Sequence, residues 1–159
     1  MEKKAEKFVS PLHIPVFLIA ADDIAAPMCV TMASILANTK AFIEFYILER
    51  SSLKISPEKK ERIEKLRNRY SAFSIEYIEV NPDDFAGLAP TTAGYIPNDT
   101  YFRYIIPELK PEIKKAVYLD VDIIVKKDIA DLYCEKLGKN YIGAVSYTHL
   151  RAHETLMNL

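Results

Sequence analysis

The pattern of apolar and polar residues predicts strands and helices that alternate along the chain. A continuous apolar run of strand length occupies 15–21 (PVFLIAA), a second strand is expected at 42–48 (FIEFYIL), and 73–80 (FSIEYIEV) alternates as a third strand would. The segments between them, 27–39 and 56–69, carry apolar residues at helical spacing. Because the connections are short, this β-α-β-α-β series predicts a doubly wound α/β fold with a mostly parallel sheet.

The second half of the chain continues this pattern after a long loop. Residues 81–100 are rich in Pro, Gly, Asp and Thr and predict a loop, and loops of this length are often functional. A helix is expected over 100–109, and Pro107 is expected to end or kink it. Three more elements are expected: a strand at 117–125, a short helix at 128–137 and a strand at 141–145.

The strand expected at 117–125, VYLDVDIIV, contains two aspartates, Asp120 and Asp122. On a regular strand both side chains point the same way, with their Cα atoms about 6.6 Å apart. Two buried carboxylates aimed together repel each other and need a cation. Oxygen ligands suit Mg²⁺ or Mn²⁺, which commonly share their other positions with phosphates and water. Alternatively, the strand ends at Leu119 and both aspartates lie in a solvated turn.

A second acidic pair, Asp22 and Asp23, ends the first predicted strand. In open parallel sheets, ligands bind beyond the carboxyl ends of the strands. We therefore expect both acidic pairs to face one crevice.

Composition excludes several classes of function. The chain has 159 residues, half of them hydrophobic, which is enough for one domain with a core. Its net charge of −1 argues against nucleic acid as a partner. No apolar run is long enough for a transmembrane segment, and the N-terminus has no secretory signal. Cys29 and Cys134 suggest no disulfide framework, which favours a cytoplasmic location.

A series of motifs in this chain is similar to one in glycosyltransferase family 8. The motifs are IPVFLIAADD, MASILANT, FYIL, IEYIEVNPDDFAGL, TYFRYIIPEL and VYLDVDIIV, in that order. The resemblance covers residues 14–145 and is strongest to the bacterial lipopolysaccharide galactosyl- and glucosyltransferases. It implies a GT-A type nucleotide-sugar-binding domain, a UDP-hexose donor, Mn²⁺ or Mg²⁺ as cofactor, and retention of the anomeric configuration. It also implies a saccharide or lipid-linked saccharide acceptor, reached from a peripheral position at the inner membrane face.

The resemblance assigns eight residues to the binding of the nucleotide sugar: Ala20, Ala21, Asp22, Asp23, Arg103, Asp120, Val121 and Asp122. Among them, Asp120 and Asp122 would hold the metal, and Asp22 would accept a hydrogen bond from uracil. Arg103 would reach the sugar-nucleotide, or else pair with Glu108. The resemblance assigns no catalytic residue, because UDP is a metal-assisted leaving group that needs no general acid.

Two features depart from the family pattern. The family commonly has Asn-Tyr after the acidic pair, with the tyrosine packed on uracil, where this chain has Ile24 and Ala25. Tyr95 or Tyr101 would have to stack there instead. The family also completes its metal site with a downstream histidine near a Gly and a Lys-Pro-Trp, and this chain contains no Trp.

We divide the chain into three parts. Residues 1–13 are an N-terminal extension, 14–145 the nucleotide-sugar-binding part, and 146–159 a non-native tail that looks like translated sequencing-adapter or vector sequence. The tail histidines, His149 and His153, receive no metal role. We expect a truncated transferase, and the resulting uncovered sheet edge predicts self-association.

Two other functions fit parts of the sequence. Phosphatases of the haloacid dehalogenase type also place D-x-D after an apolar strand, although usually the first strand rather than the fourth. A non-catalytic nucleotide-binding fragment is the second alternative, because the motifs cover the nucleotide half of the family and little of its acceptor half.

Overall fold

A four-stranded parallel sheet forms the centre of the computed structural model, which describes residues 11–81, 85 and 98–144. The strand order is β3-β2-β1-β4, and all three pairings are parallel. The strands are β1 (His13–Ile19), β2 (Phe42–Arg50), β3 (Phe73–Val80) and β4 (Val117–Tyr118). This sheet confirms the predicted α/β class, and three of its strands lie where the apolar runs placed them.

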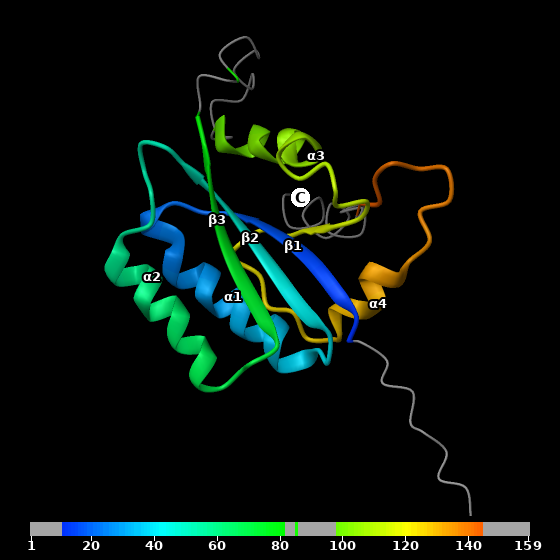
Figure 1. The fold of residues 1–159 in the computed structure, drawn as a ribbon, viewed down its shortest axis with the longest axis horizontal. Coiled ribbons are helices and arrows are strands. Elements are labelled where there is room, and N and C mark those ends of the chain that lie inside the picture. Colours follow the sequence, from blue (N-terminus) through cyan, green and yellow to red (C-terminus); the bar gives the residue numbers. More distant parts are fainter. Residues whose placement is uncertain (1–10, 82–84, 86–97, 145–159) are drawn as a thin grey trace, which may run out of the picture.

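Helices cover both faces of the sheet (Figure 1). One face carries α1 (Ala25–Asn38) and α2 (Pro57–Glu64), which continues into the 3₁₀ turn η2 (Lys65–Asn68). The other face carries η4 (Asn98–Ile105) and α3 (Ile106–Leu109). The remaining elements are η1 (Asp22–Ile24) after β1 and α4 (Ile129–Cys134) after β4.

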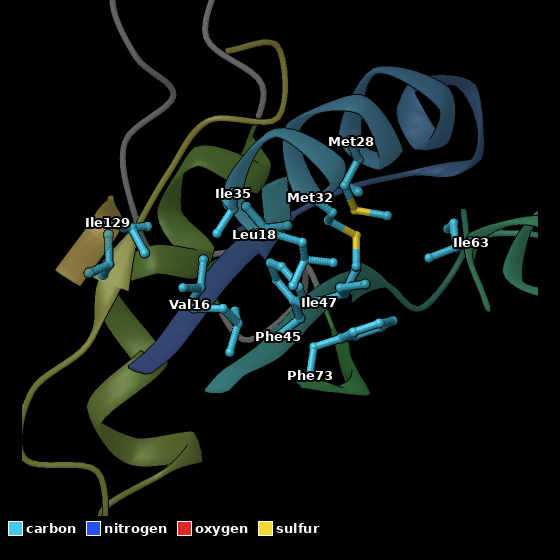
Figure 2. Close-up of a cluster of buried hydrophobic side chains, with 14 of the residues drawn as sticks. Val16, Leu18, Met28, Met32, Ile35, Phe45, Ile47, Ile63, Phe73 and Ile129 are labelled. Carbon is cyan, nitrogen blue, oxygen red and sulfur yellow. The ribbon is translucent and has the colours of Figure 1, made fainter. Parts of the chain in front are cut away.

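Strand side chains alternate between the two faces, so the sheet separates two apolar clusters. On the face covered by α1 and α2, Phe45 and Phe73 belong to one buried cluster with Met28 and Ile63 (Figure 2). The opposite cluster joins five residues: Phe17, Leu48, Val80, Phe85 and Phe102. Because both faces are covered, the interior strand β1 is a nearly continuous apolar run in the sequence, whereas the edge strand β3 alternates and exposes Ser74, Glu76 and Glu79.

Three predicted elements were wrong in extent or type. The strand expected over 117–125 contains only Val117–Tyr118. The Leu119 N–H still bonds to β1, but the carbonyls of Val121 and Ile123 bond to Thr31 of α1. Residues 141–144 form no strand; Tyr141 and Ile142 are 98% and 76% exposed, with no strand beside them in the described part of the chain to supply hydrogen bonds.

The helix expected over 100–109 was also wrong in type, because it is mostly 3₁₀. Pro107 does not end it. Pro107 lies in the first turn of α3, where a missing N–H costs nothing. The predicted loop at 81–100 falls mostly outside the described residues. Among the residues that the structure describes, no helix is both long and apolar enough to cross a membrane.

A buried ion pair fixes the loop between β2 and α2. Glu49 is 3% exposed, and its two carboxylate oxygens accept from Ile55 N–H at 2.8 Å and from Lys60 Nζ at 2.7 Å. The Lys60 ammonium also lies 4.0 Å from the centre of the Tyr77 ring. Lys60 therefore neutralises a carboxylate that has almost no access to solvent.

We expect Lys60→Met to destabilise the protein by about 3 kcal/mol, since it leaves the Glu49 charge buried without its partner. Urea unfolding followed by circular dichroism measures this loss. Lys65→Met is the control, because Lys65 is exposed just beyond the same helix. Adding Glu49→Gln to Lys60→Met should recover part of the loss. Equal unfolding midpoints for the two lysine variants would contradict this account of the pair.

Candidate functional site

The first candidate segment, 20–23, leaves the carboxyl end of β1 and turns toward α2. Ala20 is buried, and its N–H donates to the Leu48 carbonyl at 3.1 Å, so the chain stays beside β2 up to this point. Ala21 is extended and half-buried, and its carbonyl accepts from Ile24 N–H to close η1. The acidic pair therefore lies on a short turn at the carboxyl edge of the sheet.

Asp22 ties this turn to the start of α2. Its Oδ1 accepts from Ser56 N–H at 2.8 Å, and its Oδ2 accepts from Lys59 Nζ at 2.7 Å. These hydrogen bonds, that from Lys59 first, lower the pKa of Asp22 to about 2. Ser56 occupies the predicted N-cap position of α2, but its side chain makes no capping hydrogen bond. The backbone N–H of Ser56 donates to the Asp22 carboxylate. Asp23 on the same turn is exposed.

The depressed pKa of Asp22 predicts a specific acid response. An aspartate with its folded-state pKa lowered from 3.8 to about 2 contributes stability above pH 4, and that contribution is lost as pH falls toward 2. We expect Asp22→Asn to flatten the stability curve in this window, as measured by urea unfolding at pH 2 to 5. Asp23→Asn is the matched control. If both variants keep the wild-type acid slope, Asp22 is not linked to folding as described.

The second candidate segment follows β4 and carries Asp120 and Asp122. Leu119 N–H donates to the Phe17 carbonyl at 3.2 Å, after which the chain leaves the sheet in a turn. Both aspartates are exposed, as in the turn that was the alternative interpretation of the sequence. The prediction that these two carboxylates are buried and must bind a cation is therefore wrong, because water reaches both of them.

Burial still alternates along this segment. Leu119, Val121 and Val125 are partly buried against the cluster beneath α1, whereas Asp120 and Asp122 are exposed. The two carboxylates therefore share the outer side of the segment. Because β4 pairs with β1 in parallel, this side lies at the same edge of the sheet as Asp22.

Tyr118 and Arg103 lie next to the aspartate pair. Tyr118 Oη donates to Asp120 Oδ1 at 3.3 Å, and the Arg103 guanidinium carbon lies 5.3 Å from the centre of the Tyr118 ring. Burial, followed by the charge of Asp120, raises the pKa of Tyr118 to about 12, so the phenol stays protonated at neutral pH. Sequence reasoning missed Tyr118, although its position two residues before Asp120 was a signal.

Polar side chains of α1 hold the backbone of the aspartate segment. Thr31 Oγ1 lies 2.8 Å from the carbonyls of both Val121 and Ile123. Farther along the helix, Ser34 Oγ accepts from Val125 N–H at 2.9 Å. Asn38 Nδ2 donates to the Val125 carbonyl at 3.0 Å. Sequence reasoning missed these residues as well; the signal was a polar stripe at helical spacing on an otherwise apolar helix.

The carboxylates of Asp120 and Asp122 could hold a metal ion whose other positions are filled by a bound ligand and water. Within the described ranges, no group of three or more His, Cys, Asp or Glu residues could hold a metal. Asp120 and Asp122 supply two hard oxygen donors, and Mg²⁺ is often bound by only one or two carboxylates together with phosphates and water. The pair therefore suits Mn²⁺ or Mg²⁺ shared with a diphosphate.

Ile24 and Ala25, which stand where the family commonly has Asn-Tyr, offer no aromatic ring that could stack on uracil. Ile24 packs against the core and Ala25 is 2% exposed. Tyr101 is half-buried, with its ring centre 6.1 Å from that of Tyr104. Tyr95 and the tail at 146–159 lie outside the described residues.

Residues 15–158 match the sequence model of the family named glycosyl transferase family 8. The chain belongs to glycosyltransferase family 8. This family 8 chain is 31% identical over 134 residues to a Haemophilus influenzae protein named as a glycosyltransferase, covering 84% of this chain and 39% of that protein. It is 29% identical over 147 residues to human glycosyltransferase 8 domain-containing protein 1, covering 84% and 36%. The chain thus spans well under half the length of these relatives.

Solved structures support the same assignment for this family 8 member. The galactosyltransferase LgtC, in complex with donor and acceptor sugar analogs, superposes with a TM-score of 0.73 at 29% identity, covering 91% of this chain and 51% of LgtC. The bifunctional glycosyltransferase WbbM superposes at 0.63 with 25% identity, covering 84% and 23%. The fold is therefore that of a GT-A type glycosyltransferase, and family membership gives the phosphatase interpretation no support.

Proposed function

We propose that this chain is the donor-binding part of a metal-dependent, retaining hexosyltransferase that uses a UDP-hexose. The observation that carries the proposal is the exposed pair Asp120 and Asp122 at the carboxyl edge of a parallel sheet. Ligands bind at this edge in open α/β sheets. The likeness to LgtC, whose structure was solved with donor and acceptor sugar analogs, supports a sugar donor as the ligand.

In this proposal Asp120 and Asp122 hold Mn²⁺ or Mg²⁺ against the UDP diphosphate. When bound, the metal supplies positive charge that stabilises the leaving diphosphate. Tyr118 orients the Asp120 carboxylate by its hydrogen bond, and Arg103 adds a positive charge 5.3 Å from the centre of the Tyr118 ring. No described side chain needs to act as a general acid, because UDP leaves without protonation.

The nucleotide contacts follow from the turn after β1. Each carboxylate oxygen has a second acceptor position, so Asp22 can accept from the uracil N–H while it holds Ser56 and Lys59. Ala21 has a small side chain and is half-buried, so a base can approach its backbone, and Asp23 adds an exposed carboxylate. Ala20 is buried and holds the start of this turn beside β2 through its hydrogen bond to the Leu48 carbonyl. The backbone of Val121, between the two aspartates, would lie near the ribose of the bound nucleotide.

The acceptor that we propose is a saccharide, free or lipid-linked, of lipopolysaccharide or another cell-envelope glycan. This rests on the resemblance to bacterial family members that act on such acceptors. A cytoplasmic protein, peripheral at the inner membrane face, would meet both the UDP-hexose and a lipid-linked acceptor. Self-association through the edge strand β4 remains a prediction of the same proposal.

Thermal unfolding with nucleotide sugars tests the proposal. With Mn²⁺ present, UDP-glucose or UDP-galactose at about 100 times its Kd should stabilise the chain by about 2.7 kcal/mol, or a rise in Tm of about 5–10 °C. ADP-glucose is the control and should give no comparable rise. Failure of both UDP-hexoses to protect the chain would contradict the proposal. Protection by UDP without any hexose transfer would favour the non-catalytic, nucleotide-binding alternative.

A further inference from the structure

The segment that carries Asp120 and Asp122 lies outside the sheet and needs hydrogen-bond partners for its backbone. Beyond Leu119 it makes no ladder bond to any strand that the structure describes, and β4 ends at Tyr118. Partly buried backbone groups without partners would destabilise this conformation. The partners come from one stripe of α1 that runs along the segment from Val121 to Val125.

Thr31 has a particular place in this stripe. Its side chain is fully buried, and its hydroxyl oxygen lies 2.8 Å from the carbonyls of Val121 and Ile123, the residues on either side of Asp122. A threonine hydroxyl has one proton, so it donates to one carbonyl at a time or shares the proton between them. Either way, one rigid helix residue constrains the backbone on both sides of Asp122.

We propose that Thr31 is a positioning residue that sets the Asp122 carboxylate at the geometry needed for a metal–diphosphate ligand. This inference rests on the proposed function. It assigns to Thr31 the effect known for groups that orient metal ligands without touching the metal. Thr31 lies on a different element, ninety residues away in sequence, so no local feature of the D-x-D segment reveals it.

Other residues at the end of α1 hold the later part of this segment, so the loss of the Thr31 hydroxyl should affect mainly the backbone next to Asp122. Ser34 and Asn38 hold Val125, and Thr39 donates to Asp128 at 2.6 Å. None of these bonds involves the Thr31 hydroxyl, so we expect them to persist when it is removed. The segment should therefore stay attached to α1 while its first part, 121–123, gains freedom.

Three variants test this inference. Thr31→Val removes the hydroxyl at nearly constant shape, Thr31→Ser keeps it, and Ile35→Val truncates a buried side chain one helical turn along α1. For each, calorimetry measures the Kd of UDP in Mn²⁺, and hydrogen exchange measures the amides of 119–125. We expect Thr31→Val to weaken UDP binding by about 10- to 100-fold and to speed exchange in 121–123. Thr31→Ser and Ile35→Val should bind within about threefold of wild type.

The outcomes separate the two proposals. Normal UDP binding by Thr31→Val would overturn the positioning role and leave the proposed function intact. Equal losses for Thr31→Val and Ile35→Val would also overturn it, because general destabilisation would then explain both. A wild-type chain without Mn²⁺-dependent UDP binding would overturn the proposed function, and the positioning role with it.

Discussion

Replacing Asp120 and Asp122 together by asparagine is expected to weaken Mn²⁺-dependent UDP binding by at least about 100-fold, or about 3 kcal/mol. Asparagine keeps the size and the carbonyl oxygen but removes both negative charges, which attract the cation. Both side chains are exposed, so their replacement should leave the unfolding midpoint close to that of wild type.

Asp131→Asn is the matched control, because it makes the same chemical change at an exposed aspartate on α4. Calorimetry with UDP and Mn²⁺ compares the variants, and circular dichroism confirms that each is folded. If the double variant binds like the Asp131 variant, the aspartate pair does not hold the metal. Single variants should each lose part of the affinity, because each leaves one carboxylate in place.

Replacing Phe45 by alanine is expected to destabilise the protein by about 3–5 kcal/mol. Phe45 is 1% exposed at the centre of the cluster between the sheet and the helices, and its ring packs edge-on against Phe73 with centres 6.1 Å apart (Figure 2). Truncation leaves a cavity that the surrounding strands cannot fill. Because single domains are stable by only about 5–15 kcal/mol, this loss takes a large part of the total.

Tyr104→Ala controls for the loss of an aromatic ring, because Tyr104 is 64% exposed. We expect a change within about 0.5 kcal/mol for this variant. Urea unfolding gives both values from the shift in midpoint at constant slope. A loss below about 1 kcal/mol for Phe45→Ala would mean that this cluster is not the packed core of the fold.

The elements that the sequence predicted well are those whose signal is local. The run 73–80 predicted β3 at its observed bounds, and Ser56-Pro57 marked the start of α2. In both cases the determining property, apolar periodicity or a helix-starting proline, lies within the element itself. The same holds for β1, since a fully buried strand shows as an unbroken apolar run.

The elements that were predicted wrongly depend on partners far away in the sequence. Seven of the nine residues in the run 117–125 are apolar, yet only two of them form β4. Backbone groups farther along the run bond to Thr31 and Ser34 of α1 instead of to a strand. The run at 141–144 has strand composition but no strand beside it in the described part of the chain. Composition alone carries no information on such partners.

The candidate site likewise contains residues that the sequence reveals locally and residues whose roles depend on distant contacts. D-x-D and the aspartates after β1 were visible from sequence because their residue types are unusual beside apolar runs. The ion pair of Asp22 with Lys59 joins residues 37 apart in sequence and required the structure. The roles of Tyr118 and Thr31 likewise depend on contacts that folding creates.

The affinity of the wild-type chain for UDP, measured by calorimetry in Mn²⁺ and again in EDTA, tests whether Asp120 and Asp122 hold a metal for the nucleotide. We expect UDP to bind in Mn²⁺ and its affinity to weaken by at least about 100-fold when the metal is removed. Equal affinity in Mn²⁺ and in EDTA, or no binding in either, would contradict the assignment of Asp120 and Asp122 as the metal site of a UDP-hexose transferase.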